Sequence, residues 1–362
     1  MDIDIILEPD VSPAQVAELA VEAEKIGIRA IWTSNYSQNY DCFMSLMPAA
    51  AVTSKILLGT LAVTPWEMHP LKMANALLTL NQHSNGRAMV AISGGGGVLG
   101  AMGWRIHKDG PVWPIKDEAK GQRYPERRVR GLQECIEVLN LARSGKMAYK
   151  YDGEIFQITR PFQMGWDTSE TGPLIYGCCS GPMMIRTGAR IADGIQLSDY
   201  TPDMMPVAKE NLAKGLEKRE WPADNFRVGN FWAWHIKEDK EVSLREARRE
   251  LIWRGAIAGK SEHEIRPHVN DDEEVQLVID NWDNFFKAFW TRSGDIDGVP
   301  EDIVNNMIAG MSSAGDLSAI DGQLERFKQF EAAGLTELSI RVFDDPMDGL
   351  KLIGKHVLPK FQ

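Results

Sequence analysis

The sequence predicts an α/β fold, a single eight-stranded parallel (β/α)8 barrel of the TIM type that spans residues 1–362 and carries two insertions. Short apolar runs of strand length alternate with segments of helical periodicity, which is the pattern of βαβ units around a parallel sheet. The alternation gives eight strands, each followed by a helix. A strand and a helix also stand at both ends of this long chain, an arrangement that the alternative, a doubly wound sheet, does not predict.

The first repeat has the clearest boundaries. Residues 3–7 form an apolar strand, and Ser12 then offers an N-cap oxygen ahead of Pro13 at the first helical position. Apolar residues follow at helical spacing until Gly27, which is a typical helix stop. The next predicted elements are strand 30–33, helix 44–53, strand 56–63, helix 71–82 and strand 88–92.

The fourth strand runs into Gly94–Gly97 and then into Leu99–Tyr124, which is rich in Gly, Pro, Trp and Lys. That composition predicts an insertion over the barrel mouth, with Trp104 and Trp113 as its cover. The later predicted elements are helix 127–143, hairpin 149–158, strand 174–177, helix 182–190, strand 195–197, helix 206–218, strand 226–236, helix 241–259, a second insertion at Ser261–Asp297, helix 320–333, strand 337–342 and helix 347–357.

Composition narrows the classes of function. A formal charge of −11 with no cluster of Lys and Arg argues against nucleic-acid binding. No apolar stretch approaches the roughly 20 residues that span a membrane, and the start of the chain does not read as a signal peptide. The 4 cysteines are not spaced as metal pairs. We expect a cytoplasmic protein that binds a small-molecule substrate and has no metal site, no nucleic-acid partner and no membrane segment.

The candidate site follows from the fold, because ligands of such barrels lie at the C-terminal ends of the strands. The residues that follow the predicted strands there are polar and glycine-rich: Ser34–Tyr36, Leu61–His69, Ser93–Gly97, Cys178–Gly181 and Ser198–Asp199. Glycines let the backbone approach a flat ring or a phosphate, although Gly94–Gly97 also suits a flexible turn. Ser180 and Gly181 open a helix that suits an anion or is simply capped. His69 suits either a helix cap or a catalyst.

Several ordered motifs resemble those of the luciferase-like family. They are Glu24–Trp32, Leu58–Pro65 with His69-Pro70, Leu80–Arg87, Gly181-Pro182 with Gly188–Gly194, and Val357–Pro359. This family comprises bacterial luciferases, flavin-dependent monooxygenases and reductases that use the deazaflavin coenzyme F420, all on an α/β barrel. The resemblance implies an oxidoreductase that works with a flavin or deazaflavin ring, and a homodimer.

Site residues follow from the strand ends and from the family resemblance together. We expect Asn35, Tyr36 and His69 to be the catalytic polar groups near the ring, and the resemblance implies a non-proline cis peptide between Leu61 and Ala62. The residues expected to bind the cofactor are Leu61, Ala62, Ser93, Gly94, Gly95, Gly96, Gly97, Cys179, Ser180 and Gly181.

Three functions stay open at this point. F420-dependent members commonly carry an acid and a histidine where this chain has Ser34 and Asn35, and a glutamate where it has Gly97. Bacterial luciferase carries a basic residue in the region of Gly95. The leading hypothesis is a monooxygenase that uses oxygen and reduced FMN from a separate flavin reductase. The alternatives are F420-dependent hydride transfer, similar to methylenetetrahydromethanopterin reductase, and a non-catalytic flavin-binding protein.

Overall fold

The structure is a computed structural model that describes residues 1–104, 125–168 and 172–361. Eight strands form a closed barrel in the order β1-β10-β9-β8-β7-β4-β3-β2, which confirms the predicted fold class. The chain divides into two compact units. The N-terminal unit comprises residues 2–197 and 206–229, and the C-terminal unit comprises residue 1 with residues 198–205 and 230–362. One domain over residues 1–362 stays a prediction.

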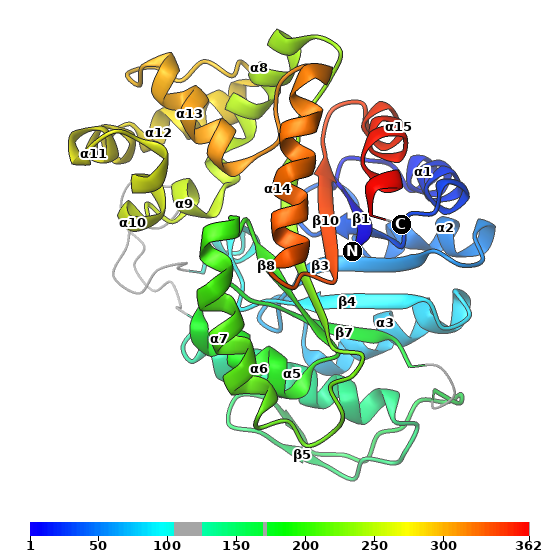
Figure 1. Cartoon of the computed structure of the whole chain (residues 1–362). Coiled ribbons are helices and arrows are strands. Elements are labelled where there is room, and N and C mark those ends of the chain that lie inside the picture. Colours follow the sequence, from blue (N-terminus) through cyan, green and yellow to red (C-terminus); the bar gives the residue numbers. More distant parts are fainter. Residues whose placement is uncertain (105–124, 169–171, 362) are drawn as a thin grey trace. The chain divides into compact units, whose positions relative to one another are not determined.

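In the N-terminal unit each barrel strand is followed by a helix, as Figure 1 shows. Its strands are β1 (Asp2–Leu7), β2 (Ala30–Ser34), β3 (Leu57–Val63), β4 (Ala88–Ile92), β7 (Leu174–Cys178) and β8 (Gly194–Ser198). Its helices are α1 (Pro13–Ile26), α2 (Met47–Val52), α3 (Pro70–His83), α4 (Gly97–Ala101), α5 (Arg128–Arg143), α6 (Pro182–Ile191) and α7 (Met205–Leu216). The neighbouring strands from β1 to β4, and then β7 and β8, pair in parallel, which places their C-terminal ends at one edge.

The predicted boundaries of the first repeat are confirmed in detail. Ser12 Oγ accepts from the Gln15 backbone N–H, and the Gln15 side chain accepts from the Ser12 N–H, so α1 begins with a capping box. Gly27 ends the helix with φ at 91°, in the left-handed region that favours glycine. These local signals are independent of the rest of the fold, which is why the sequence alone was sufficient to predict them.

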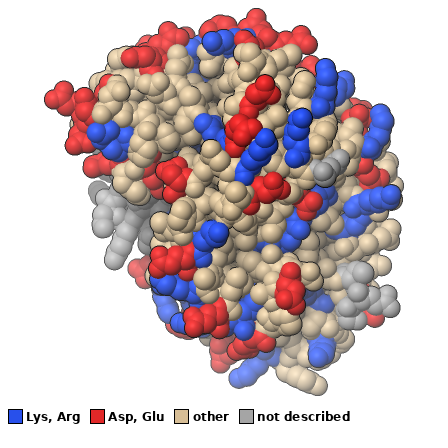
Figure 2. Space-filling view, viewed as in Figure 1, with Lys and Arg blue, Asp and Glu red and all other residues tan. Residues whose placement is uncertain are grey.

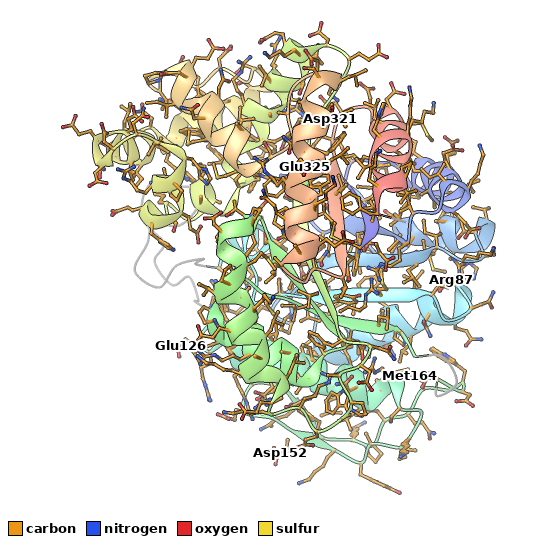
Figure 3. All side chains as sticks on the ribbon, in the orientation of Figure 1. Arg87, Glu126, Asp152, Met164, Asp321 and Glu325 are labelled. Atoms are coloured by element: carbon orange, nitrogen blue, oxygen red, sulfur yellow. The ribbon has the colours of Figure 1, made fainter. Side chains whose placement is uncertain are left out.

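Arg87, labelled in Figure 3, explains why the Leu80–Arg87 motif ends in arginine. Its guanidinium donates to the carbonyls of Ile56 at 2.7 Å, Ser84 at 2.7 Å and Ala50 at 3.1 Å. These bonds join α2 and the segments that lead into β3 and β4. Because these bonds come from three separate nitrogens of the guanidinium, the single ammonium nitrogen of a lysine would not replace them.

The predicted hairpin is also present, and it is short. β5 (Tyr151–Asp152) and β6 (Gln157–Ile158) pair antiparallel. Of the predicted Leu99–Tyr124 insertion, residues 105–124 with Trp113 lie outside the described residues, so the cover over the barrel mouth stays a prediction.

The C-terminal unit contains β10 (Glu337–Val342) and most of β9 (Arg227–Trp234). Its helices are α8 (Lys240–Glu250), α9 (Gly255–Ala258), α10 (Glu262–Ile265), α11 (Asp272–Asp280), α12 (Trp282–Thr291), α13 (Glu301–Met311), α14 (Ile320–Ala332) and α15 (Pro346–His356). The predicted insertion Ser261–Asp297 is therefore mostly helical, since it forms α10 to α12. Helix α13 was not predicted.

Two tryptophans of β9 pack in the core of this unit. The Trp232 indole N–H donates to Ser313 Oγ at 2.8 Å, and its ring contacts that of Phe330. Trp234 lies 6.4 Å from Phe327, measured between ring centroids. Both phenylalanines belong to α14, so these tryptophans hold a helix against the strand.

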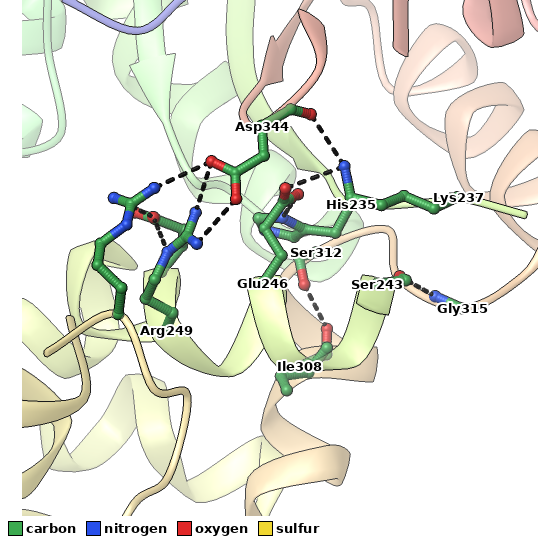
Figure 4. Close-up of polar contacts among 11 residues, drawn as sticks. His235, Lys237, Ser243, Glu246, Arg249, Ile308, Ser312, Gly315 and Asp344 are labelled. Carbon is green, nitrogen blue, oxygen red and sulfur yellow. Dashed lines mark hydrogen bonds and ion pairs between the residues drawn. The ribbon is translucent and has the colours of Figure 1, made fainter. Parts of the chain in front are cut away.

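A charged cluster joins α8 to the residues that follow β9 and β10 in the C-terminal unit, with His235, Glu246 and Arg249 buried and Asp344 exposed (Figure 4). His235 Nδ1 lies 2.9 Å from Glu246 Oε1, and Lys237 Nζ lies 3.0 Å from the second oxygen of that carboxylate. Arg249 pairs with Asp344 at 2.9 Å. Burial lowers the pKa of His235, although Glu246 partly opposes the shift.

The surface carries both signs of charge. Figure 2 shows Lys and Arg side chains interspersed with Asp and Glu on the face in view. Within residues 1–104, 125–168 and 172–361, no helix is long and apolar enough to cross a membrane. In the same ranges no group of three or more His, Cys, Asp or Glu side chains is arranged to hold a metal ion.

Candidate functional site

The C-terminal end of β3 is hydrogen-bonded to the residues that follow its two neighbouring strands, β2 and β4. The peptide bond between Leu61 and Ala62 is cis, as predicted, and the β3–β4 register shifts between Thr60 and Val63. The Asn35 backbone N–H donates to Leu61 O at 2.9 Å, and the Ser93 N–H donates to Val63 O at 2.9 Å. The structure therefore brings together the predicted residues Asn35, Leu61, Ala62 and Ser93, with Tyr36 next in the chain.

A half-buried carboxylate that sequence reasoning did not single out lies beside Asn35. Asn35 Nδ2 donates to Glu67 Oε1 at 2.8 Å and to Ala62 O at 3.1 Å. The Thr64 backbone N–H donates to the same Glu67 oxygen at 2.7 Å. Burial raises the pKa of Glu67, and the hydrogen bonds from Thr64 and Asn35 oppose the shift only in part. One signal was available, since Glu67 is the only acidic residue in residues 56–83.

His69 caps a helix. Its Nδ1 accepts from the Leu71 backbone N–H at 3.2 Å, at the start of α3. Burial lowers the pKa of His69, so the ring is neutral near pH 7 and carries its proton on Nε2. The capping role that the sequence left open is thus present, and a catalytic role for Nε2 stays a prediction.

Aromatic rings line the chain beside His69. The Phe156 ring, from the turn between β5 and β6, stands edge-on to His69 with 5.6 Å between ring centroids. Trp66 lies 5.6 Å from Phe156 and 6.0 Å from Trp104, measured in the same way. We call Trp66, Trp104 and Phe156 the aromatic wall.

A carboxylate of α5 holds the turn that carries Phe156. The buried Glu134 side chain accepts from the backbone N–H groups of Glu154 at 2.8 Å and of Ile155 and Phe156 at 2.9 Å. A Cβ on Gly153 would lie 2.4 Å from Glu134 Oε2, so the turn needs glycine there. The aromatic wall therefore depends on a contact between α5 and the hairpin.

The four consecutive glycines have different surroundings. A Cβ on Gly94 would lie 3.1 Å from Met184 Cε, and a Cβ on Gly95, whose φ is 88°, would lie 2.2 Å from Leu99 Cδ1. An added Cβ on Gly96 would meet no atom of the described residues within 4 Å, and Gly97 begins α4. Local packing thus accounts for the first two glycines, whereas no described residue packs against the Cβ position of Gly96.

The residues after β7 lie next to this glycine loop. The Cys179 N–H donates to Gln196 O at 2.9 Å, and the Cys179 thiol donates to Met184 O at 3.2 Å. Gly181 is the N-cap of α6, and a Cβ there would meet nothing within 4 Å. Since Gly94 is close to Met184 in the first turn of α6, the predicted groups after β4 and β7 are neighbours.

The predicted site residues thus gather at the C-terminal ends of β2, β3, β4 and β7, which is where barrel enzymes bind their ligands. A sequence profile described as luciferase-like monooxygenase matches residues 4–337, and the chain belongs to this family. Membership confirms the family and the predicted class of enzyme, an oxidoreductase of the flavin and deazaflavin type.

Individual relatives give a finer comparison. The chain is 26% identical to a 5,10-methylenetetrahydromethanopterin reductase of Archaeoglobus fulgidus, over 100% of both chains. It is 27% identical to an F420-dependent glucose-6-phosphate dehydrogenase of Amycolatopsis mediterranei, over 57% of this chain and 61% of that protein.

Solved structures agree on the fold. The F420-dependent tetrahydromethanopterin reductase of Methanopyrus kandleri has a TM-score of 0.80 and 24% identity, with 100% of this chain and 99% of that chain covered. A monooxygenase from Streptomyces bottropensis has a TM-score of 0.63 and 18% identity, with 100% of both chains covered.

Proposed function

We propose that the chain is a coenzyme F420-dependent oxidoreductase that transfers a hydride, with a methylene-tetrahydropterin as the substrate class. The observation that carries the proposal is sequence similarity over the full length. Two 5,10-methylenetetrahydromethanopterin reductases align with 100% and 99% of this chain, whereas the similarity to monooxygenase structures is weaker. F420 is thus favoured over reduced FMN, and a separate flavin reductase is not needed.

The residues present fit a flat ring with polar edges. Ser34 Oγ is buried at the C-terminal end of β2 and has no hydrogen-bond partner among the described residues. Ala62 offers a small side chain at the bulge of β3, and no described residue packs against the Cβ position of Gly96. A buried hydroxyl without a hydrogen-bond partner destabilises the folded protein. A ligand group that forms a hydrogen bond with Ser34 would therefore bind favourably.

In this proposal the described residues divide the work. Leu61, Ala62 and Ser93–Gly97 hold the ring, and Cys179, Ser180 and Gly181 hold the phosphate-bearing tail near the start of α6. The bound deazaflavin supplies the hydride. Asn35, Tyr36 and His69 contact the ring or the substrate, and the aromatic wall keeps water away from the reacting atoms.

The test is a comparison of cofactors on the purified protein. We expect F420 to bind in a fluorescence titration and reduced F420 to be oxidised without oxygen when a methylene-tetrahydropterin is added. Tight binding of FMN, with oxygen consumed in the presence of reduced FMN, would support the monooxygenase instead. Binding of a flavin with no turnover of any offered substrate would support the non-catalytic protein. The homodimer stays a prediction, and analytical ultracentrifugation would test it.

A further inference from the structure

We propose that Glu67 is a positioning residue, which fixes the Asn35 amide so that its Oδ1 faces the bound ring or substrate as a hydrogen-bond acceptor. The inference rests on the proposed function. Glu67 is a residue that the family resemblance did not indicate. The ligand edge that meets Asn35 carries an N–H or O–H donor.

Both hydrogens of the Asn35 amide nitrogen have hydrogen-bond acceptors. Asn35 Nδ2 donates one to Ala62 O at 3.1 Å and the other to Glu67 Oε1 at 2.8 Å. Both partners are acceptors, so Oδ1 cannot take the place of Nδ2 without two repulsive contacts. The amide therefore has one orientation, and its oxygen points away from both partners.

That oxygen is free to accept from a ligand. Among the described residues no donor is hydrogen-bonded to Asn35 Oδ1, while the backbone N–H of the same residue is held by Leu61 O at 2.9 Å. Asn35 is half-buried and lies directly after β2, at the edge where the predicted ring-binding residues meet. An acceptor fixed at three points is preorganised for a ligand.

Glu67 is itself held by neutral groups. Its Oε1 accepts from the Thr64 N–H at 2.7 Å, and no Lys, Arg or His forms an ion pair with it within residues 1–104, 125–168 and 172–361. Asp41 is a further negative charge nearby. Partial burial of a carboxylate without a cation costs free energy, but the charged oxygen is a strong hydrogen-bond acceptor for the Asn35 amide.

Glu67→Leu and Glu67→Gln separate this role from a merely structural one. Leucine removes the acceptor. Glutamine keeps one side-chain oxygen, which can still accept from the Thr64 N–H and from Asn35 Nδ2. The first readout needs no cofactor: the side-chain amide signal of Asn35 in a 1H–15N spectrum, assigned by its loss in Asn35→Ala. We expect it to shift in Glu67→Leu and to exchange with solvent at least about tenfold faster, since one of its two hydrogen bonds is lost. It should stay near the wild-type position in Glu67→Gln.

The second readout is titration with F420. We expect Kd to rise about tenfold or more in Asn35→Ala and Glu67→Leu, and to stay within about threefold of wild type in Glu67→Gln. Glu18→Leu, on the exposed side of α1, is the control and should change neither readout. An unchanged Asn35 signal in Glu67→Leu overturns the inference, and so does an unchanged Kd. Failure of the wild type to bind F420 overturns the proposed function, while the amide signal still decides the role of Glu67.

Discussion

Trp32 and Gly59 face each other across β2 and β3, and the buried indole covers the glycine so closely that an added Cβ would lie 2.3 Å from Trp32 Cε3. We expect Gly59→Ala to lower the free energy of unfolding by about 1–3 kcal/mol or more, because the packed indole has to move. Urea unfolding measures the loss. Gly322→Ala, in α14 with nothing within 4 Å of the new Cβ, is the control and should stabilise by about 0.5–1 kcal/mol.

Gly95 and Gly96 should differ when each is changed to valine. Gly95→Val should lower the melting temperature, because φ is 88° and the new Cβ would collide with Leu99. Gly96→Val should keep the melting temperature and weaken F420 binding, because its Cβ would meet no atom of the described residues within 4 Å and would enter the space proposed for the cofactor. Calorimetry and titration report the two effects separately. Equal F420 affinity in wild type and Gly96→Val would remove Gly96 from the cofactor site.

Glu134→Ala should loosen the hairpin that carries Phe156. The change leaves three backbone N–H groups without their acceptor, and we expect a loss of about 2–4 kcal/mol in stability with faster protease cleavage near residues 151–158. Mass spectrometry of the first fragments locates the cut. Glu137→Ala, which loses the hydrogen bond from the Tyr151 hydroxyl, is the matched control and should have the smaller effect. Identical first cuts in both variants would contradict the role of Glu134.

Acid should destabilise the chain through His235. Burial lowers the pKa of His235 below 6.5 in the folded state, so the unfolded chain binds the proton more tightly. The stabilisation is present above pH 6.5 and is lost as the pH falls through the folded pKa. We expect the free energy of unfolding to fall less steeply from about pH 7.5 to about pH 5 in His235→Gln than in wild type. Parallel curves for the two proteins would show that another group carries the effect.

Local signals decided how much of the fold could be predicted. The ends of α1 were readable because Ser12, Pro13 and Gly27 act within one turn of the helix. Helix α13 was overlooked although Ile303, Met307 and Met311 fall at helical spacing, because Pro300 precedes it in place of a side-chain cap.

The site was harder to predict than the fold, because burial depends on the whole structure. The sequence marked the loop after β3, but only the packing shows that Glu67 is half-buried and hydrogen-bonded to Asn35. The sequence also does not separate the four glycines, whereas in the structure Gly95 is needed for its own loop and no described residue packs against the Cβ position of Gly96.

The four cysteines have a practical consequence for spectroscopy. Cys42, Cys135 and Cys179 are buried, and burial raises the pKa of each thiol, to about 12 for Cys42. Cys178 alone among the four is partly exposed, and it ends β7 beside the residues proposed to hold the cofactor tail. Because maleimides react with accessible thiolates, a fluorophore would attach first at Cys178, in the protein as it stands. That dye would report ligand arrival at the barrel without any engineered cysteine.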